Sequence, residues 1–248
     1  MSAGWIVRLA VLALLVVFLL APDRFAPLFA PLVRPGAPAI YDQGSLLWLT
    51  LAHLATVLVA TAASTVVAVG LAILVTRPAG AAFLPLSRSL AHAGQTFPPV
   101  AVLALAVPLV GFGEAPTLIA LFLYGLLPVF ENALAGFTGI APAVAEAARG
   151  MGMTGRDRLL GVEVPLALPL TLEGIRLALI INLGTATIGS TVAAKGLGEV
   201  IIAGLISTNL AFVVQGGLVV AVLAVLLFDG AGVLVAVAGR RAGRMAAG

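Results

Sequence analysis

The sequence predicts an all-α, polytopic membrane helix bundle with about six transmembrane helices. Of its 248 residues, 62% are hydrophobic and 9% are charged, whereas soluble domains carry roughly 25% charged residues. The mean hydropathy is +1.20. A water-soluble fold of this length could not bury so much apolar surface, so we expect lipid to surround it. Within lipid a segment must satisfy its own backbone hydrogen bonds, which favours helices over isolated strands.

Apolar segments divide the chain into six candidate spans, as the length of roughly 20 residues per span allows. They cover residues 5–21, 47–76, 96–112, 115–136, 168–192 and 211–238. The second segment is longer than one span needs, so we expect part of it to tilt or project. A single membrane domain, residues 1–248, is expected to cover the chain.

The first segment, residues 5–21, has two interpretations. It carries one arginine, an apolar run and small residues after it, which is also the pattern of a secretory signal peptide. Its basic region is weak, which favours a retained first helix. A cleaved segment would leave five spans.

The connections differ in composition. Residues 22–46 are rich in proline and hold charged side chains, so we expect an external loop. Residues 77–95 hold Arg77, Pro78, Arg88 and His92 and predict a short internal connection. Residues 193–210 contain several glycines and predict a re-entrant or surface helix.

The basic residues predict the orientation of the bundle. With six spans and a cytoplasmic C-terminus, most arginines fall on the cytoplasmic side, in agreement with the positive-inside rule. That side receives Arg8, Arg77, Arg88, Arg149, Arg156, Arg158, Arg240, Arg241 and Arg244. The other side receives Arg24, Arg34 and Lys195, and Arg176 falls within a span near its inner end. We therefore expect both termini in the cytoplasm.

A polar, helix-compatible stretch, residues 137–167, separates the fourth and fifth spans on that same side. Pro142 suits the first turn of a helix, where its missing N–H would be unpaired in any case. Residues 143–149 are good helix formers. Gly150 and Gly152 can end that helix in a left-handed cap.

A second short helix is expected after the glycines. Thr154 and Asp157 have the spacing of an approximate capping box. Pro165 and Pro169 are expected to close the loop before the fifth span. The result would be two short helices meeting at a glycine elbow.

Several side chains of this stretch fit contact with another protein. Ala147, Ala148 and Gly152 are small and would permit close approach, while Glu146 can pair with a partner's base or cap its own helix. An ordinary cytoplasmic loop with helical caps is the alternative.

The spacing of this stretch resembles the cytoplasmic EAA loop of ABC importer permeases. Glu146-Ala147-Ala148 is followed by Gly152 at the family's distance and by a closing Pro165. Val162 and Val164 stand where the family usually has Ile and Leu. The resemblance implies that the loop docks into an ATP-hydrolysing subunit. The coupling residues it implies are Glu146, Ala147, Ala148, Arg149, Gly150, Gly152 and Pro165.

A wider resemblance covers roughly residues 46–208 and is centred on 146–200. The stretches ARGMGMT, VPLALPL, EGIRLALIINLGTATIG and KGLGEVIIAGL are similar to permeases for glycine betaine, carnitine and choline. It implies the type I ABC importer permease fold in a bacterial inner membrane. It also implies a second permease subunit, ATPase subunits that bind ATP and Mg, and an extracytoplasmic substrate-binding protein. Glu131, Glu173 and Ala194-Lys195 depart from the family's pattern.

Small polar side chains interrupt the fifth span, and they support two interpretations. They are Asn182, Thr185, Thr187, Ser190 and Thr191. Such residues either pack helices together or line a polar translocation pathway. A substrate with a quaternary ammonium would be repelled by Arg176, which we expect to snorkel or to pair with Glu173 or Glu131.

Other functions have less support in the sequence. There is no HExxH, GxSxG or Walker A motif, no cysteine and no catalytic constellation, so we expect neither an enzyme nor a metal site. The charged residues lie mostly between apolar segments, which argues against nucleic-acid binding. An ABC permease for an amino acid or another small polar solute is the first alternative. An ion-coupled transporter is the second, with Glu131 as its acidic residue inside a span.

Overall fold

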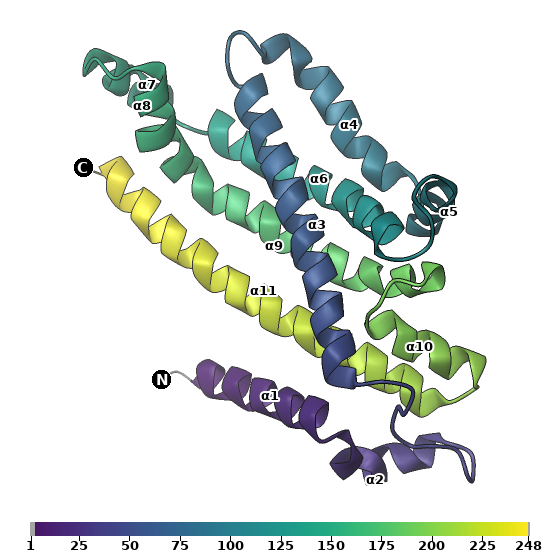
Figure 1. Ribbon diagram of the computed structural model, residues 1–248. Coiled ribbons are helices and arrows are strands. Elements are labelled where there is room, and N and C mark those ends of the chain that lie inside the picture. Colours follow the sequence, from purple (N-terminus) through teal and green to yellow (C-terminus); the bar gives the residue numbers. More distant parts are fainter. Residues whose placement is uncertain (1–2, 248) are drawn as a thin grey trace. The chain divides into compact units, whose positions relative to one another are not determined.

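The computed structural model describes residues 3–247, and the regular elements in that range are helices (Figure 1). In chain order they are α1 (Ala3–Leu20), η1 (Pro22–Phe25), α2 (Ala26–Phe29), η2 (Ala30–Leu32), α3 (Leu46–Val75), η3 (Ala81–Phe83), α4 (Leu84–Thr96), α5 (Pro99–Val110), α6 (Glu114–Thr138), α7 (Pro142–Gly150), α8 (Gly155–Arg158), the π-helical η4 (Leu159–Glu163), α9 (Val164–Gly189), η5 (Ser190–Val192), α10 (Leu197–Ile206) and α11 (Leu210–Ala247). The prediction of an all-α membrane bundle is confirmed.

Four helical segments of the described range are long and apolar enough to cross a membrane. They are Leu46–Val75, Glu114–Thr138, Gly155–Val192 and Leu210–Gly243. Two interrupted pairs raise the number to six if each pair is one span: Gly4–Leu20 with Pro22–Leu32, and Ala81–Thr96 with Pro99–Val110. The first pair bends by 111°. The expectation of about six spans thus agrees with the upper count.

Two predicted connections contain helices. Residues 77–95 were expected as a short connection, but α4 occupies most of that stretch. Arg88 and His92 are one turn apart and share a face of α4, so their polarity marks an amphipathic helix and not a loop. The short helices η1, α2 and η2 likewise occupy part of the expected loop 22–46. The helix expected within 193–210 is present as α10.

Pro165 and Pro169 lie inside a helix, so the expectation that they close the loop was wrong. Pro165 is the second residue of α9 and Pro169 is within its first two turns. The Val164 N–H donates to the Leu159 carbonyl, five residues back, in the π-helical turn η4. This wider turn relieves the crowding that the Pro165 ring would cause four residues earlier.

The chain forms two compact units, each built from three or more separate stretches. The first comprises residues 1–59, 98–121 and 182–227, and the second comprises 60–97, 122–181 and 228–248. Four of the five boundaries fall inside α3, α6, α9 and α11, so each of these long helices contributes to both units, and the fifth lies between α4 and α5.

The first unit buries several polar side chains. His53 Nε2 lies 3.0 Å from the Leu183 carbonyl oxygen. Gln215 accepts from the Tyr41 N–H at 3.1 Å and donates to the Ala39 carbonyl at 2.8 Å. Burial, with the nearby Glu199 carboxylate, raises the pKa of the Tyr41 hydroxyl. The Gln215 bonds fix the proline-rich loop before α3 onto α11, and the His53 bond joins α3 to α9.

The core of the second unit is rich in alanine and glycine. Ala68, Ala72, Ala133 and Ala178 are almost fully buried around Phe130. Such small residues let helix backbones approach closely.

Most of the basic residues also belong to the second unit. Nine of the 13 arginines and lysines fall in its residue ranges, and these are Arg77, Arg88, Arg149, Arg156, Arg158, Arg176, Arg240, Arg241 and Arg244. The orientation of the bundle stays a prediction.

Candidate functional site

The loop between α6 and α9 turns at Gly152. Pro142 occupies the first turn of α7, as predicted. The Met151 N–H donates to Ala147 at 3.0 Å, and the Gly152 N–H donates to Arg149 at 2.9 Å. Gly152 has a φ of +76°, whereas Gly150 is the last residue of α7. A Cβ at Gly152 would meet nothing within 4 Å, so glycine is required there for its conformation and not for space.

The capping box that follows the turn is confirmed. The Asp157 N–H donates to Thr154 Oγ1 at 3.2 Å, and the Thr154 N–H donates to Asp157 Oδ2 at 3.3 Å. However, α8 is not a separate short helix, because it continues through η4 into α9. Figure 1 shows α7 and α8 side by side at the start of α9. The elbow therefore joins one short helix directly to a span.

The exposed side chains of the loop define the surface that a partner could reach. Ala147, Arg149, Gly150 and Gly152 are exposed, and Pro165 is half-buried. Glu146 is exposed and makes no hydrogen bond or ion pair within residues 3–247, so it does not cap its own helix.

Two residues of this loop differ from the expectation. Ala148 is only 2% exposed, so it packs against its own chain and cannot contact a partner. Met151 is 73% exposed at the elbow. Met151 was not predicted as a contact residue; its position between Gly150 and Gly152 in the tight turn is the signal for its exposure.

A buried carboxylate fixes the base of the loop. Glu163, in η4, accepts from Arg158 Nε at 3.0 Å and from Arg77 Nη2. Arg77 also donates from Nε to the Ile73 carbonyl at 3.3 Å. This network was not predicted from the sequence, although a lone carboxylate in the run before Pro165 is a sign that a cation lies nearby. Glu163 thereby links the loop to the end of α3.

The five small polar residues of the fifth span do not form one face. Asn182 is fully buried, whereas Thr191 is exposed. At 100° per residue, Thr187, Ser190 and Thr191 lie on one side, and Asn182 and Thr185 lie roughly opposite.

The hydroxyls on the first of these sides bond to nearby backbone. Thr187 donates to Gly184 at 2.7 Å, and Thr191 donates to Ile188 at 2.7 Å. Ser190 donates to Ala194 at 3.1 Å. Both helix packing and a pathway are compatible with this arrangement.

The charged residues within the spans have local partners. Arg176 pairs with Glu173 at 3.0 Å, and its guanidinium lies 3.4 Å from the Phe228 ring centroid. Glu131 pairs instead with Arg88, at 3.0 Å. Glu173 and Asp229 also lie inside α9 and α11, so Glu131 is not the only acidic residue within a span. Because Glu131 is neutralised by Arg88, it is a poor candidate for ion coupling.

Comparisons with known proteins identify the family of the chain. Residues 68–238 match the family model described as "Binding-protein-dependent transport system inner membrane component". The chain is 38% identical over 185 residues to the osmoprotectant import permease protein OsmY of Salmonella typhimurium, covering 75% of this chain and 78% of that protein. It is 35% identical over 189 residues to the glycine betaine/carnitine/choline transport system permease protein OpuCB of Bacillus subtilis, covering 75% and 85%.

Solved structures agree on the fold. A chain of the inward-facing MetNI methionine ABC transporter aligns with a TM-score of 0.69 at 20% identity, covering 79% of this chain and 99% of that one. A chain of an amino acid ABC transporter aligns with a TM-score of 0.60 at 18% identity, covering 90% and 98%. The family model spans more than half of this chain, and the curated relatives exceed 30% identity over most of their length. The chain therefore belongs to the family of binding-protein-dependent transport system inner membrane components and is a multi-pass transport permease subunit.

Proposed function

We propose that this chain is the membrane-spanning permease subunit of an ABC importer for quaternary-ammonium osmoprotectants of the glycine betaine, choline and carnitine type. The observation that carries the proposal is the 38% identity to a permease named for osmoprotectant import and the 35% identity to one named for glycine betaine, carnitine and choline. The chain hydrolyses nothing in this scheme. Partner ATPase subunits bind ATP and Mg, a second permease subunit completes the pathway, and an extracytoplasmic binding protein delivers the solute.

The proposed coupling surface is the exposed side of α7 and its elbow. The exposed Glu146 makes no ion pair among the described residues, so its carboxylate is available to a partner's base, and Met151 offers an apolar contact. The elbow joins α7 to α8, and α8, η4 and α9 form one continuous helical segment. A displacement of the proposed coupling surface would therefore reach the start of α9 through the elbow. ATP favours one of two arrangements only through contacts that differ between them, and this surface would supply those contacts.

The proposed pathway uses the other end of α9. Thr187, Ser190 and Thr191 already donate their protons to backbone carbonyls. A solute at this side of the helix would therefore meet mainly oxygen lone pairs. That arrangement suits a cation without N–H donors, and it binds weakly enough for the solute to leave.

The proposed orientation places both termini and the α7–α8 loop in the cytoplasm of a bacterial cell, with the bundle in the inner membrane. The concentration of basic residues in the second unit supports it through the positive-inside rule. Reporter fusions at Gly36 and at Gly248 are expected to report opposite sides. Signals from the same side would contradict the orientation.

Reconstitution tests the proposed function. Proteoliposomes containing the permease, its ATPase and its binding protein are expected to take up glycine betaine, choline or carnitine only when ATP is present. Uptake driven by a proton or sodium gradient without ATP would contradict the ABC mechanism. ATP-driven uptake restricted to amino acids without a quaternary nitrogen would keep the mechanism and refute the substrate class.

A further inference from the structure

A cavity of about 360 Å³ lies behind the α7–α8 loop, within the second unit. The end of α3, the C-terminal part of α6, α7 and η4 all contribute to its wall. One part of the wall is apolar and includes Leu134, Phe137 and Val162. The other part carries charge, and we call it the arginine wall: Arg77, Arg149, Arg158 and Glu163.

The arginine wall has more positive than negative charge. Arg77 and Arg158 share the single carboxylate of Glu163. Arg149 makes no hydrogen bond or ion pair in the part of the chain that the structure describes. The arginine wall thus holds three guanidinium groups and one carboxylate, which leaves an excess of two positive charges. A concave surface with low-dielectric walls focuses such a field and attracts counter-ions.

We propose that this cavity binds the phosphate group of an anionic ligand, either a phospholipid headgroup or a small soluble phosphate ester. Guanidinium groups match phosphate oxygens bidentately, and their charge is independent of pH in the physiological range. The volume accommodates a phosphate with a glycerol-sized substituent. The cavity also lies where α3 and α6 end, and basic pockets at the ends of membrane helices are known to receive lipid headgroups. The inference does not depend on which solute is transported.

A ligand in this cavity would act on the loop. Arg149 belongs to α7, Arg77 follows α3, and Arg158 belongs to α8. A phosphate that accepts hydrogen bonds from Arg149 and from either of the other two connects α7 to the rest of the unit. The bound ligand thereby restricts α7, which is joined to α8 by the turn at Gly152.

The test uses the full-length chain and two probes. Binding of glycerol 3-phosphate is measured by calorimetry in detergent. Binding of phosphatidylglycerol is measured by native mass spectrometry, after release from phosphatidylcholine nanodiscs with and without that lipid. We expect the wild-type chain to retain at least one probe. Arg149→Gln is expected to weaken it about tenfold or more, because a charge-assisted hydrogen bond is lost.

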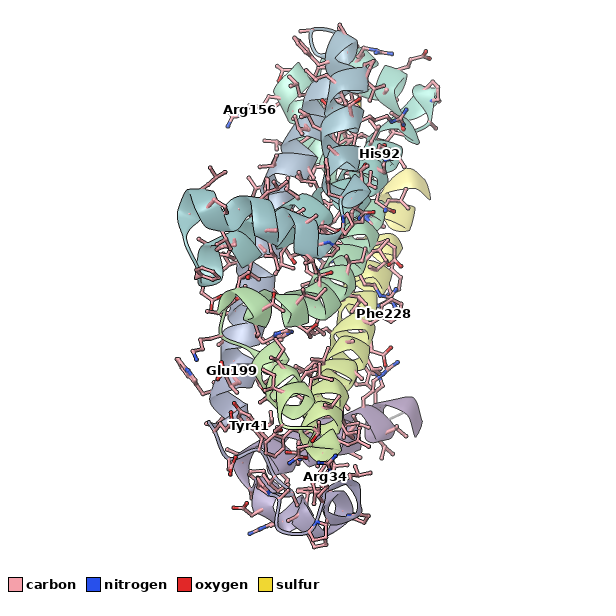
Figure 2. The ribbon with its side chains drawn as sticks, turned by 90° about the vertical axis from the view of Figure 1, so that its right-hand side faces the viewer. Arg34, Tyr41, His92, Arg156, Glu199 and Phe228 are labelled. Carbon is pink, nitrogen blue, oxygen red and sulfur yellow. The ribbon has the colours of Figure 1, made fainter. Side chains whose placement is uncertain are left out.

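Two further variants keep the result interpretable. Arg156→Gln is the matched control, because Arg156 is exposed, lies outside the cavity lining and extends away from the ribbon (Figure 2). It removes the same charge from the same loop and is expected to change binding by less than about twofold. Ala145→Phe fills the cavity without changing charge and is expected to abolish binding.

Each outcome decides between stated possibilities. Glycerol 3-phosphate binding that Ala145→Phe abolishes identifies a site for soluble phosphate esters, whereas retention of phosphatidylglycerol alone identifies a lipid site. Equal weakening by Arg149→Gln and Arg156→Gln would overturn the proposal in favour of diffuse surface charge. Failure of the wild-type chain to bind either probe would also overturn it, and would leave the proposed transport function untouched.

Discussion

The two units of the chain fix their elements with different chemistry. In the second unit, charged groups join separate elements: Glu163 holds Arg77 and Arg158, and Glu131 holds Arg88. In the first, hydrogen bonds join separate elements: His53 bonds to Leu183, Gln215 bonds to Tyr41 and Ala39, and the Glu114 carboxylate accepts from Thr56 and from the Lys195 N–H.

The contrast fits the proposed division of labour. A unit that receives force from a partner benefits from charge pairs that lose much stability when they separate. A unit that a cationic solute crosses benefits from hydrogen bonds between its elements, because a hydrogen-bonded group repels or traps a charge less than an unpaired ionic group does.

The largest effect is expected from Glu163→Ala in the second unit. It leaves Arg77 and Arg158 facing each other without their carboxylate, which should cost about 2 to 4 kcal/mol of the free energy of unfolding. Denaturation of the purified chain in detergent measures it. Glu146→Ala is the matched control, because the exposed Glu146 makes no ion pair within the described residues, and it should change stability by less than about 0.5 kcal/mol. If the two variants were equally stable, the ion pairs of Glu163 would not contribute to the stability of the fold.

A smaller loss is expected from Gln215→Leu in the first unit. The substitution keeps the volume but leaves the Tyr41 N–H and the Ala39 carbonyl unpaired, which should cost about 1 to 3 kcal/mol. Faster hydrogen exchange of the Tyr41 amide would report the local release of the loop. Gln95→Leu loses one exposed hydrogen bond in the second unit and should have little effect. If Gln95→Leu cost as much as Gln215→Leu, the loop would not depend on Gln215.

The elbow of the proposed coupling surface is tested by making the same substitution, glycine to alanine, at Gly152 and at Gly150 in two separate variants. Gly152→Ala places a Cβ on a residue with a φ of +76° and should cost about 1 to 2 kcal/mol locally. Gly150→Ala stays helical and should be neutral or slightly stabilising. Co-purification with the ATPase should fall several-fold in the first variant only. If Gly152→Ala co-purified with the ATPase as fully as the wild-type chain does, the conformation of the elbow would not be needed for docking.

The smallest change in stability is expected from Thr187→Val. Its hydroxyl bonds only within its own helix, so the loss should stay below about 1 kcal/mol. Uptake in proteoliposomes should nevertheless fall several-fold if this side of α9 meets the solute. Thr50→Val removes a comparable hydroxyl bond, to Leu46 at 2.7 Å, outside the proposed pathway. Similar uptake by both variants would assign Thr187 to helix packing.

Composition and local spacing predicted much of this molecule. Long apolar runs specify spans because lipid leaves the backbone no other partner, and the left-handed glycine and the capping box depend only on near neighbours. The exposed side of the loop followed from the same local pattern, with Gly152 at its turn.

The remaining features depend on contacts that are distant in sequence. Ala148 is 2% exposed although its neighbours Ala147 and Arg149 are exposed, and Glu163 pairs with Arg77, 86 positions away in sequence. Pro165 fits inside a helix because the preceding turn is π-helical. No pattern of residues in the sequence predicted that π-helical turn. The charge of Arg88 and His92 favours a loop, whereas their spacing of one helical turn favours the helix that the structure has there.

The sharing of long helices between the two units has a consequence for biosynthesis. Neither unit is a continuous piece of chain, and α11 supplies the last stretch of both, with residues up to 227 in one and from 228 in the other. The ribosome synthesises the chain from the N-terminus, so neither unit can complete its folding until α11 has been made. A truncation before Leu210 would therefore leave both units incomplete, and quality-control proteases should remove the product instead of releasing a functional fragment.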